Sequence, residues 1–164
     1  DTSEAEKIPG VYKVITGKDV PGTNRLNGSA RPILSDKKIL RSGDAIAMVL
    51  AYAPTIAEEA AKKVKVAIQE LPVSTTSAVE EAQSPLEPNT GFAYLNEKGK
   101  LMIHSKNADL HLNALAEGIG VPPDKLAVVQ NHGIGASEYK IGPALEGLLG
   151  VAALVTKQPV YLEL

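Results

Sequence analysis

The chain has 164 residues and a mass of 17.2 kDa, enough for one ordinary hydrophobic core or two small cores that share an interface. Its 17 basic and 19 acidic residues nearly balance, and there is no basic run or aromatic platform, so we expect no nucleic-acid partner. Without cysteine, the chain forms no disulfide and offers no thiolate to a metal or an iron–sulfur cluster.

The longest apolar run, residues 148–155, is too short to span a bilayer, and no charged-then-apolar leader opens the sequence. We therefore expect a soluble protein without a membrane partner. The absence of cysteine fits a reducing compartment, and the cytoplasm is the expected localisation. The sequence begins at Asp1 rather than at methionine, which is compatible with processing or with a piece of a longer protein.

The first elements are short. Residues 8–16 read as a turn followed by a strand, and residues 23–30 as a polar loop. Residues 37–41 predict a modest amphipathic strand. The basic side chains of Lys37, Lys38 and Arg41 could steer an anion, although ordinary solvated surface is the favoured interpretation.

Residues 44–52 organise the first half of the chain. They are almost continuously apolar without alternation, which predicts a central strand covered on both faces. A helix with an apolar stripe follows, and Thr55 and Glu58 at its start have the spacing of a capping box. Residues 65–71 carry alternating apolar side chains before Pro72. We therefore expect two strands bridged by a helix over residues 44–71, with a right-handed crossover.

The second half begins after a change of composition at residues 72–91, which contain a candidate short helix at 78–82. Residues 92–95 and 100–105 predict a β-hairpin around the polar loop 96–99. A helix over 109–119, a buried strand over 126–130, a helix over 143–155 that is apolar nearly all round, and a final strand over 159–164 complete the chain. The pattern predicts an α+β fold.

The most suggestive chemical feature is the glycine-bearing loop of residues 131–140, between a strand and a helix. Backbone amides before a helix can hold an anionic group such as a phosphate, but a tight structural turn explains the same residues. Gly133-Ile134-Gly135 lacks the third glycine of the dinucleotide fingerprint and the Gly-Lys-Ser/Thr ending of a P-loop. Spacing alone leaves both interpretations open.

Other catalytic patterns are absent from the sequence. His104, His111 and His132 show no metal-ligand spacing, and partly exposed histidines that make backbone hydrogen bonds are the expected alternative. No serine has the context of a nucleophile elbow. Glu87 and Glu138 are the carboxylates in unusual surroundings, and surface or loop positions are the default for them. The residues alone therefore support no catalytic site, no metal site and no self-contained active site.

Several motifs in order resemble the large chain of the molybdenum hydroxylases, the xanthine dehydrogenase and aldehyde oxidoreductase family. In the first half they are Ile8-Pro9-Gly10-Val11, Thr16-Gly17-Lys18-Asp19-Val20-Pro21-Gly22, Asp36-Lys37-Lys38-Ile39, Gly43-Asp44-Ala45-Ile46-Ala47, Glu59-Ala60-Ala61 and Glu70-Leu71-Pro72. In the second half they are Leu86-Glu87-Pro88, Ile103-His104-Ser105-Lys106, Gly120-Val121-Pro122-Pro123-Asp124-Lys125-Leu126 and Gln158-Pro159-Val160. The sequence of residues 104–106 is nearer to that of bacterial aldehyde oxidoreductases than to that of xanthine dehydrogenases.

The resemblance implies an α/β hammerhead-like domain at residues 1–73, a linker at 74–90 and the start of a molybdopterin-binding α+β region at 91–164. In the family a Gly-Gly-x-Phe-Gly loop lies against the molybdenum–pterin cofactor, a molybdopterin dinucleotide. Here the corresponding cofactor-binding residues are Gly135, Ala136, Ser137 and Glu138. Ser137 replaces the Phe, and Glu138 replaces a Gly and adds bulk and negative charge beside an anionic cofactor.

The resemblance also implies a reaction and partners. The family hydroxylates aldehydes or heterocycles with water-derived oxygen and passes electrons to 2Fe–2S clusters, and in some members to FAD, carried elsewhere. The segment between Leu71 and Leu86 is shorter than in the family, and the catalytic glutamate lies beyond the region matched here. We therefore expect a part of such an enzyme, inactive alone, which joins the rest of the large chain or other subunits and could form a homodimer.

The rival hypothesis is a non-catalytic α+β binding or assembly module derived from the same fold, which Ser137 and Glu138 would suit. We also take the strand–helix–strand arrangement at residues 44–71 as a condition that the family resemblance must meet.

Overall fold

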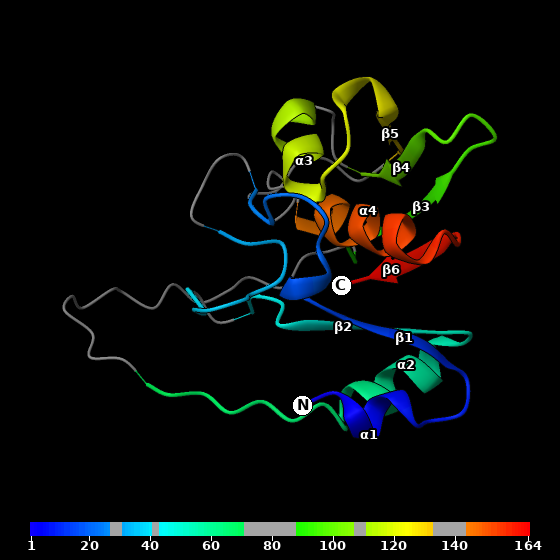
Figure 1. The fold of residues 1–164 in the computed structure, drawn as a ribbon. Helices are drawn as coiled ribbons and strands as arrows, with labels where there is room; N and C mark the ends of the chain where they lie inside the picture. Colours follow the sequence, from blue (N-terminus) through cyan, green and yellow to red (C-terminus); the bar gives the residue numbers. More distant parts are fainter. Residues whose placement is uncertain (27–30, 41–42, 71–87, 107–110, 133–143) are drawn as a thin grey trace.

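A computed structural model of the chain describes residues 1–26, 31–40, 43–70, 88–106, 111–132 and 144–164 (Figure 1). Its helices and strands are, in chain order, α1 (Ser3–Glu6), β1 (Val11–Thr16), β2 (Ala47–Ala51), α2 (Pro54–Ala61), β3 (Thr90–Leu95), β4 (Leu101–Ser105), α3 (Leu112–Ile119), β5 (Leu126–Gln130), α4 (Ala144–Thr156) and β6 (Val160–Glu163). The strands form a two-stranded sheet, β1-β2, and a four-stranded sheet in the order β5-β4-β3-β6. The predicted α+β class is confirmed.

Strand β2 has cover on both faces, as its apolar composition predicts. Ala47 and Val49 pack against a small cluster with α1 and α2, whereas Met48 and Leu50 pack against the main core. The prediction that it is a central strand is wrong, because among the described strands β2 pairs only with β1, antiparallel. The second cover comes from the main core rather than from a second neighbouring strand.

Two predictions for the following residues are also wrong. Helix α2 begins at Pro54 with Ala53 as its N-cap and without a side-chain cap, so Thr55 and Glu58 form no capping box. Proline fits the first helical position and moves the N-cap from the predicted Thr55 to Ala53, two residues earlier. The described residues 65–70 form no strand and are exposed. Among the described residues their backbone is hydrogen-bonded to Asp1, through two bonds at Lys65 of 2.7 and 3.0 Å. A strand needs a longer neighbour than one residue.

The predicted strand at residues 37–41 is absent from its described part, 37–40. Just before it, the side chain of Asn24 occupies the place of a strand neighbour. Its Nδ2 donates to the Leu34 carbonyl oxygen at 2.8 Å, and its Oδ1 accepts from the Leu34 N–H at 3.0 Å. Asn24 thus pairs the backbone around the buried Ile33 and Leu34 without a strand.

The four-stranded sheet contains the predicted hairpin and the predicted last strand. Strand β3 pairs antiparallel with β4 and with β6, whereas β4 and β5 are parallel. Asn96 closes the hairpin loop, since its Oδ1 accepts from the N–H groups of Lys98 and Lys100. Strand β5 lies at an edge of the sheet. It is less buried than predicted, because Val129 and Gln130 are exposed.

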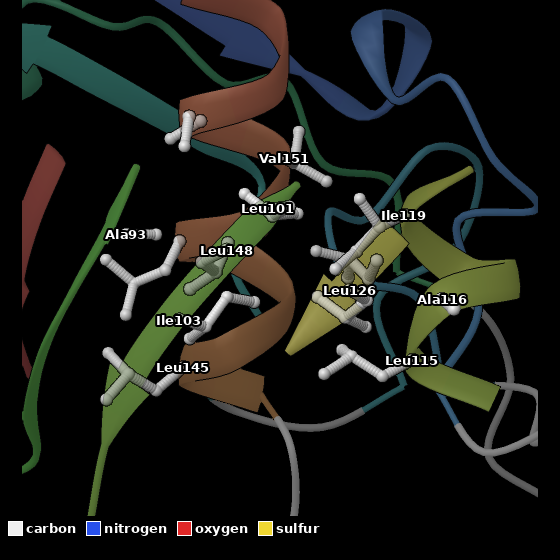
Figure 2. Packing of buried hydrophobic residues seen from close by; sticks show 14 of the residues in the cluster. Ala93, Leu101, Ile103, Leu115, Ala116, Ile119, Leu126, Leu145, Leu148 and Val151 are labelled. Carbon is white, nitrogen blue, oxygen red and sulfur yellow. The ribbon is translucent and has the colours of Figure 1, made fainter. Parts of the chain in front are cut away.

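Helix α4 crosses one face of this sheet, and its packing explains why it is apolar nearly all round (Figures 1 and 2). Leu145 and Leu149 lie against Gly91 of β3, and Gly150 lies against Ile119 of α3. On another side Gly147 faces Ile33. The helix is therefore enclosed by the sheet, by α3 and by the segment around residue 33, as its composition predicts.

Helix α3 ends as predicted, at Gly120. Gly120 has φ +94°, and its N–H donates to the Ala116 carbonyl oxygen at 2.8 Å. The chain beside Gly22 packs directly against this end, because the N–H groups of Thr23 and Asn24 donate to the carbonyl oxygens of Glu117 and Gly118. Residues from the first and second halves thus meet backbone to backbone.

The main core contains residues of both halves, including Ile15, Ile33 and Leu34 beside Ile103 and Leu149. The domain limits 1–73 and 91–164 stay a prediction, because most of the linker lies in 71–87, outside the described residues. The candidate helix 78–82, the residues Asp109 and Leu110, and Pro143 also lie outside them. In the described part of the chain no helix is long and apolar enough to cross a membrane.

Candidate functional site

The candidate loop follows the edge of the sheet where two parallel strands end together. Ser105, the last residue of β4, is in register with Gln130, the last residue of β5. The N–H of Asn131 donates to the Ser105 carbonyl oxygen at 2.6 Å and extends this pairing by one residue. In open α/β sheets, ligands bind beyond the carboxyl ends of parallel strands.

The four predicted cofactor-binding residues, Gly135, Ala136, Ser137 and Glu138, lie between β5 and α4 in sequence, outside the described residues. The structure therefore describes their framework: the paired ends of β4 and β5 before the loop, and the first turn of α4 after it. No cofactor ligand is assigned among the described residues.

A buried carboxylate, Glu146, lies in the first turn of α4, just after the candidate loop. The residue is 1% exposed and is the one charged residue of the otherwise apolar α4. A carboxylate is favoured near a helix N-terminus because it faces the positive end of the helix dipole. The burial of Glu146 could have been inferred from the apolar residues on every side of it.

Ser105 and Lys106 hold the other side of this edge. Ser105 is fully buried, and Lys106 Nζ donates to the carbonyl oxygen of Pro88 at 2.9 Å. This contact ties the end of β4 to the residues that enter β3. Ser105 and Lys106 thus help to anchor the end of the parallel pair.

The three histidines have different structural positions. His111 is the N-cap residue of α3, and His132 follows β5 and is exposed. His104 lies on β4 and stacks on Phe92, with ring centroids 4.4 Å apart. Its Nε2 is buried without a hydrogen-bond partner among the described residues, so the prediction of backbone hydrogen bonds is wrong for this atom. The His104 ring is held instead by stacking on the rings of Phe92 and Tyr94.

The described residues contain no group of three histidine, aspartate or glutamate side chains that could hold a metal ion. A hollow of about 490 Å³ lies beside α1 and the end of α2, away from the candidate loop in sequence. Lysines dominate its lining, including Lys7, Lys62, Lys63 and Lys65. Lys7 is paired with Glu4 at 2.8 Å, and the hollow shares no residue with the predicted site.

Comparison with known proteins shows which family this chain resembles. Residues 1–72 match the family described as aldehyde oxidase and xanthine dehydrogenase, a/b hammerhead domain. An aldehyde oxidoreductase of Megalodesulfovibrio gigas is 36% identical over 221 aligned residues, which take in 99% of this chain and 24% of that protein. A probable xanthine dehydrogenase component of Bacillus subtilis is 37% identical over 103 residues, covering 62% of this chain and 13% of that one.

Solved structures agree over the whole chain. The aldehyde oxidoreductase of Desulfovibrio desulfuricans superposes with a TM-score of 0.88 at 35% identity, covering 100% of this chain and 25% of the solved one. The carbon monoxide dehydrogenase of Oligotropha carboxidovorans shares the fold, with a TM-score of 0.78 at 20% identity over 98% of this chain and 28% of that one.

The chain spans about a quarter of the length of the aldehyde oxidoreductases that it matches. The match to M. gigas extends over more residues than this chain possesses, so that relative carries additional residues within the matched range.

The condition placed on residues 44–71 is not met, because residues 65–70 form no strand. The condition was too strict, because the chain is similar to aldehyde oxidoreductases over its whole length, in sequence and in structure, without that strand. The chain, with its hammerhead domain followed by a mixed sheet, belongs to the aldehyde oxidase and xanthine dehydrogenase family.

Proposed function

We propose that this chain is part of a molybdenum-dependent aldehyde oxidoreductase, which converts an aldehyde to a carboxylic acid with oxygen derived from water. The observation that carries the proposal is the whole-chain match to aldehyde oxidoreductases at 35–36% identity. Within such an enzyme this chain provides the hammerhead domain and the beginning of the molybdopterin-binding region, and the catalytic residues lie elsewhere.

Gly135, Ala136, Ser137 and Glu138 are the residues of this chain that we assign to the cofactor. When bound, a molybdenum–pterin cofactor supplies the oxygen-transfer chemistry, while the protein binds and orients it. The paired ends of β4 and β5 fix one end of the loop, and the buried first turn of α4 fixes the other. The chain's part is therefore to hold a cofactor-facing backbone segment in place.

The remaining features of the proposal concern the complete enzyme. Its substrate is a small aldehyde or heterocycle, its electrons pass to 2Fe–2S clusters and in some arrangements to FAD, and these groups are carried outside this chain. The partner is the rest of the large chain or separate subunits, and a homodimer is the proposed assembly. The cytoplasm is the proposed location, in keeping with a chain that lacks cysteine.

Purification of the protein from its native source tests the proposal directly. We expect molybdenum by metal analysis, iron–sulfur bands in the absorption spectrum, and an intact mass well above the 17.2 kDa of this sequence. A metal-free species of that mass would instead support the non-catalytic module.

A paired substitution tests the cofactor-facing loop. Gly135→Val adds a branched side chain where close backbone approach is proposed, so the molybdenum content per iron should fall severalfold. Ala67→Val is the control, because residue 67 is exposed and lies far from the loop in sequence. An unchanged molybdenum-to-iron ratio in Gly135→Val would remove residues 135–138 from the cofactor site.

A further inference from the structure

One face of the four-stranded sheet carries a continuous row of apolar and aromatic side chains. Phe92 on β3 pairs in register with His104 on β4 and with Tyr161 on β6, and His104 pairs with Val129 on β5. Directly paired residues point to the same face of a sheet, so one row runs across all four strands. Together with the next row, they form the aromatic sheet face, defined as Phe92, Tyr94, Met102, His104, Val129 and Tyr161.

The centre of this face is an ordered stack. The rings of Phe92 and His104 lie 4.4 Å apart at an interplanar angle of 7°, and Tyr94 stacks on both, at 6.3 Å from Phe92 and 5.9 Å from His104. The contacts fix the rings with respect to one another. The face is thus preorganised, which lowers the entropy that another surface must overcome to bind it.

Three of the six side chains of this face are exposed, whereas Tyr94, Met102 and His104 are partly buried. Phe92 is 42% exposed, Val129 36% and Tyr161 61%. On the other side of the same strands, Ala93 and Ile103 are fully buried beneath α4 (Figure 2). Phe92 and Tyr161 are exposed neighbours on this face, and exposed apolar side chains that gather on one face mark a surface that contacts another body.

The composition of the face indicates a permanent protein contact. None of its six residues is an aspartate, glutamate, lysine or arginine, and one carboxylate borders them. This is Glu163, two residues along β6 from Tyr161 and on the same face, which accepts a hydrogen bond from the Tyr161 hydroxyl. Aromatic residues and methionine are enriched at the centres of protein interfaces, where charged residues are depleted, and permanent interfaces are the most apolar.

We infer that the aromatic sheet face is covered by another segment of the same large chain. This segment belongs to the part of the large chain that the relatives possess beyond the quarter matched here. The inference rests on the proposed function. The aldehyde oxidoreductases are about four times as long as this chain, and one superposes on all of it. A tethered segment has a high effective concentration, so it occupies the face in preference to a second copy.

Footprinting of the native enzyme tests the inference. Hydroxyl-radical labelling followed by peptide mass analysis should modify Tyr161 severalfold less than Tyr52. An uncovered face predicts comparable reaction of both, because Tyr161 is 61% and Tyr52 79% exposed. Equal labelling of Tyr161 and Tyr52 would overturn the inference. So would loss of protection on dilution, which would indicate a second copy.

Matched variants of the complete enzyme give a second readout. Tyr161→Ser should lower its thermal midpoint by several degrees, whereas Tyr52→Ser should leave it nearly unchanged. Equal, small effects would contradict a covered face.

The two proposals fail in different ways. An enzyme that contains molybdenum but labels freely at Tyr161 retains the proposed function and loses this inference. A metal-free 17.2 kDa protein loses both, because the covering segment then does not exist.

Discussion

At the scale of single residues, the side chain of Asn24 pairs the backbone of Leu34 as a neighbouring strand would. It is 5% exposed, adopts φ +56°, and pairs both backbone groups of Leu34. Asparagine tolerates the left-handed conformation better than most residues, and its amide carries both a donor and an acceptor. Both properties are needed at this position.

Asn24→Ala should therefore lower the free energy of unfolding by about 2–3 kcal/mol, since it leaves a buried N–H and a buried carbonyl of Leu34 unpaired. Asn113→Ala, on the exposed side of α3, is the control and should change it by less than about 0.5 kcal/mol. Urea denaturation measures both, and similar losses in the two variants would refute the role given to Asn24.

Tyr161 and Glu163 form a titratable pair on β6. The Tyr161 hydroxyl donates to Glu163 Oε2 at 2.8 Å, and this hydrogen bond, desolvation and the negative charge of Glu163 raise the pKa of Tyr161 above 10.0. Because the fold holds the proton more tightly than the unfolded chain, the resulting stability is present below pH 10.0 and is lost as the pH rises through the folded pKa.

Glu163→Ala should return the pKa of Tyr161 toward 10.0 and make unfolding less steeply dependent on alkaline pH. A titration followed by tyrosinate absorbance, compared between the parent and the variant, measures the shift. Glu163→Gln should give an intermediate result, because it removes the charge and keeps an acceptor. Superimposable curves for all three proteins would contradict the pairing.

At the scale of elements, the sequence predicts type well where a run buries itself locally. The hairpin, the final strand, α3 and the enclosed α4 follow from periodicity and turn residues. Residues 65–70 do not: Val66 and Ile68 alternate as in a strand, yet no strand lies beside them in the described part of the chain. The alternation of apolar residues indicates which segments suit a strand. Whether a strand forms depends on a neighbouring strand, which the local sequence does not reveal.

The same limit applies to the candidate site. The register that brings the ends of β4 and β5 together depends on contacts between residues far apart in sequence. The four assigned loop residues come from family resemblance, because two glycines in a loop also suit an ordinary turn. The burial of Glu146, in contrast, follows from the apolar residues on every side of it in α4.

Close contact between Gly120, at the end of α3, and Gly22 gives a prediction about these elements. Gly120→Ala meets both a positive φ of +94° and the backbone of Gly22, so it should cost about 2–4 kcal/mol. Gly99→Ala, with φ +69° and open space, meets only the first penalty and should cost about 1 kcal/mol. Thermal denaturation of both variants measures the difference, and equal losses would show that the contact with Gly22 is unimportant.

At the scale of the whole molecule, the main core joins the two halves of the described chain. Ile33, from the first half, is 3% exposed and packs at Gly147 of α4 and Gly118 of α3. A core shared in this way favours unfolding as one cooperative unit.

Ile33→Ala should therefore cost about 2–5 kcal/mol and lower the stability of both halves together. Circular dichroism and tyrosine fluorescence should still give one coincident transition. Leu40→Ala is the control, because Leu40 is 43% exposed. Two separated transitions in Ile33→Ala would show that the halves are independent domains.

The place of β6 in its sheet bears on how quickly the molecule can assemble. It pairs with β3, the strand that opens this sheet, although the hairpin partner, α3, β5 and α4 all come between them in sequence. Closing so long a stretch of chain carries an entropic cost before any ladder hydrogen bond offsets it, and pairings of this kind slow folding. On the ribosome, the sheet must wait until residue 163 has emerged, and until then one side of β3 remains open to mispairing.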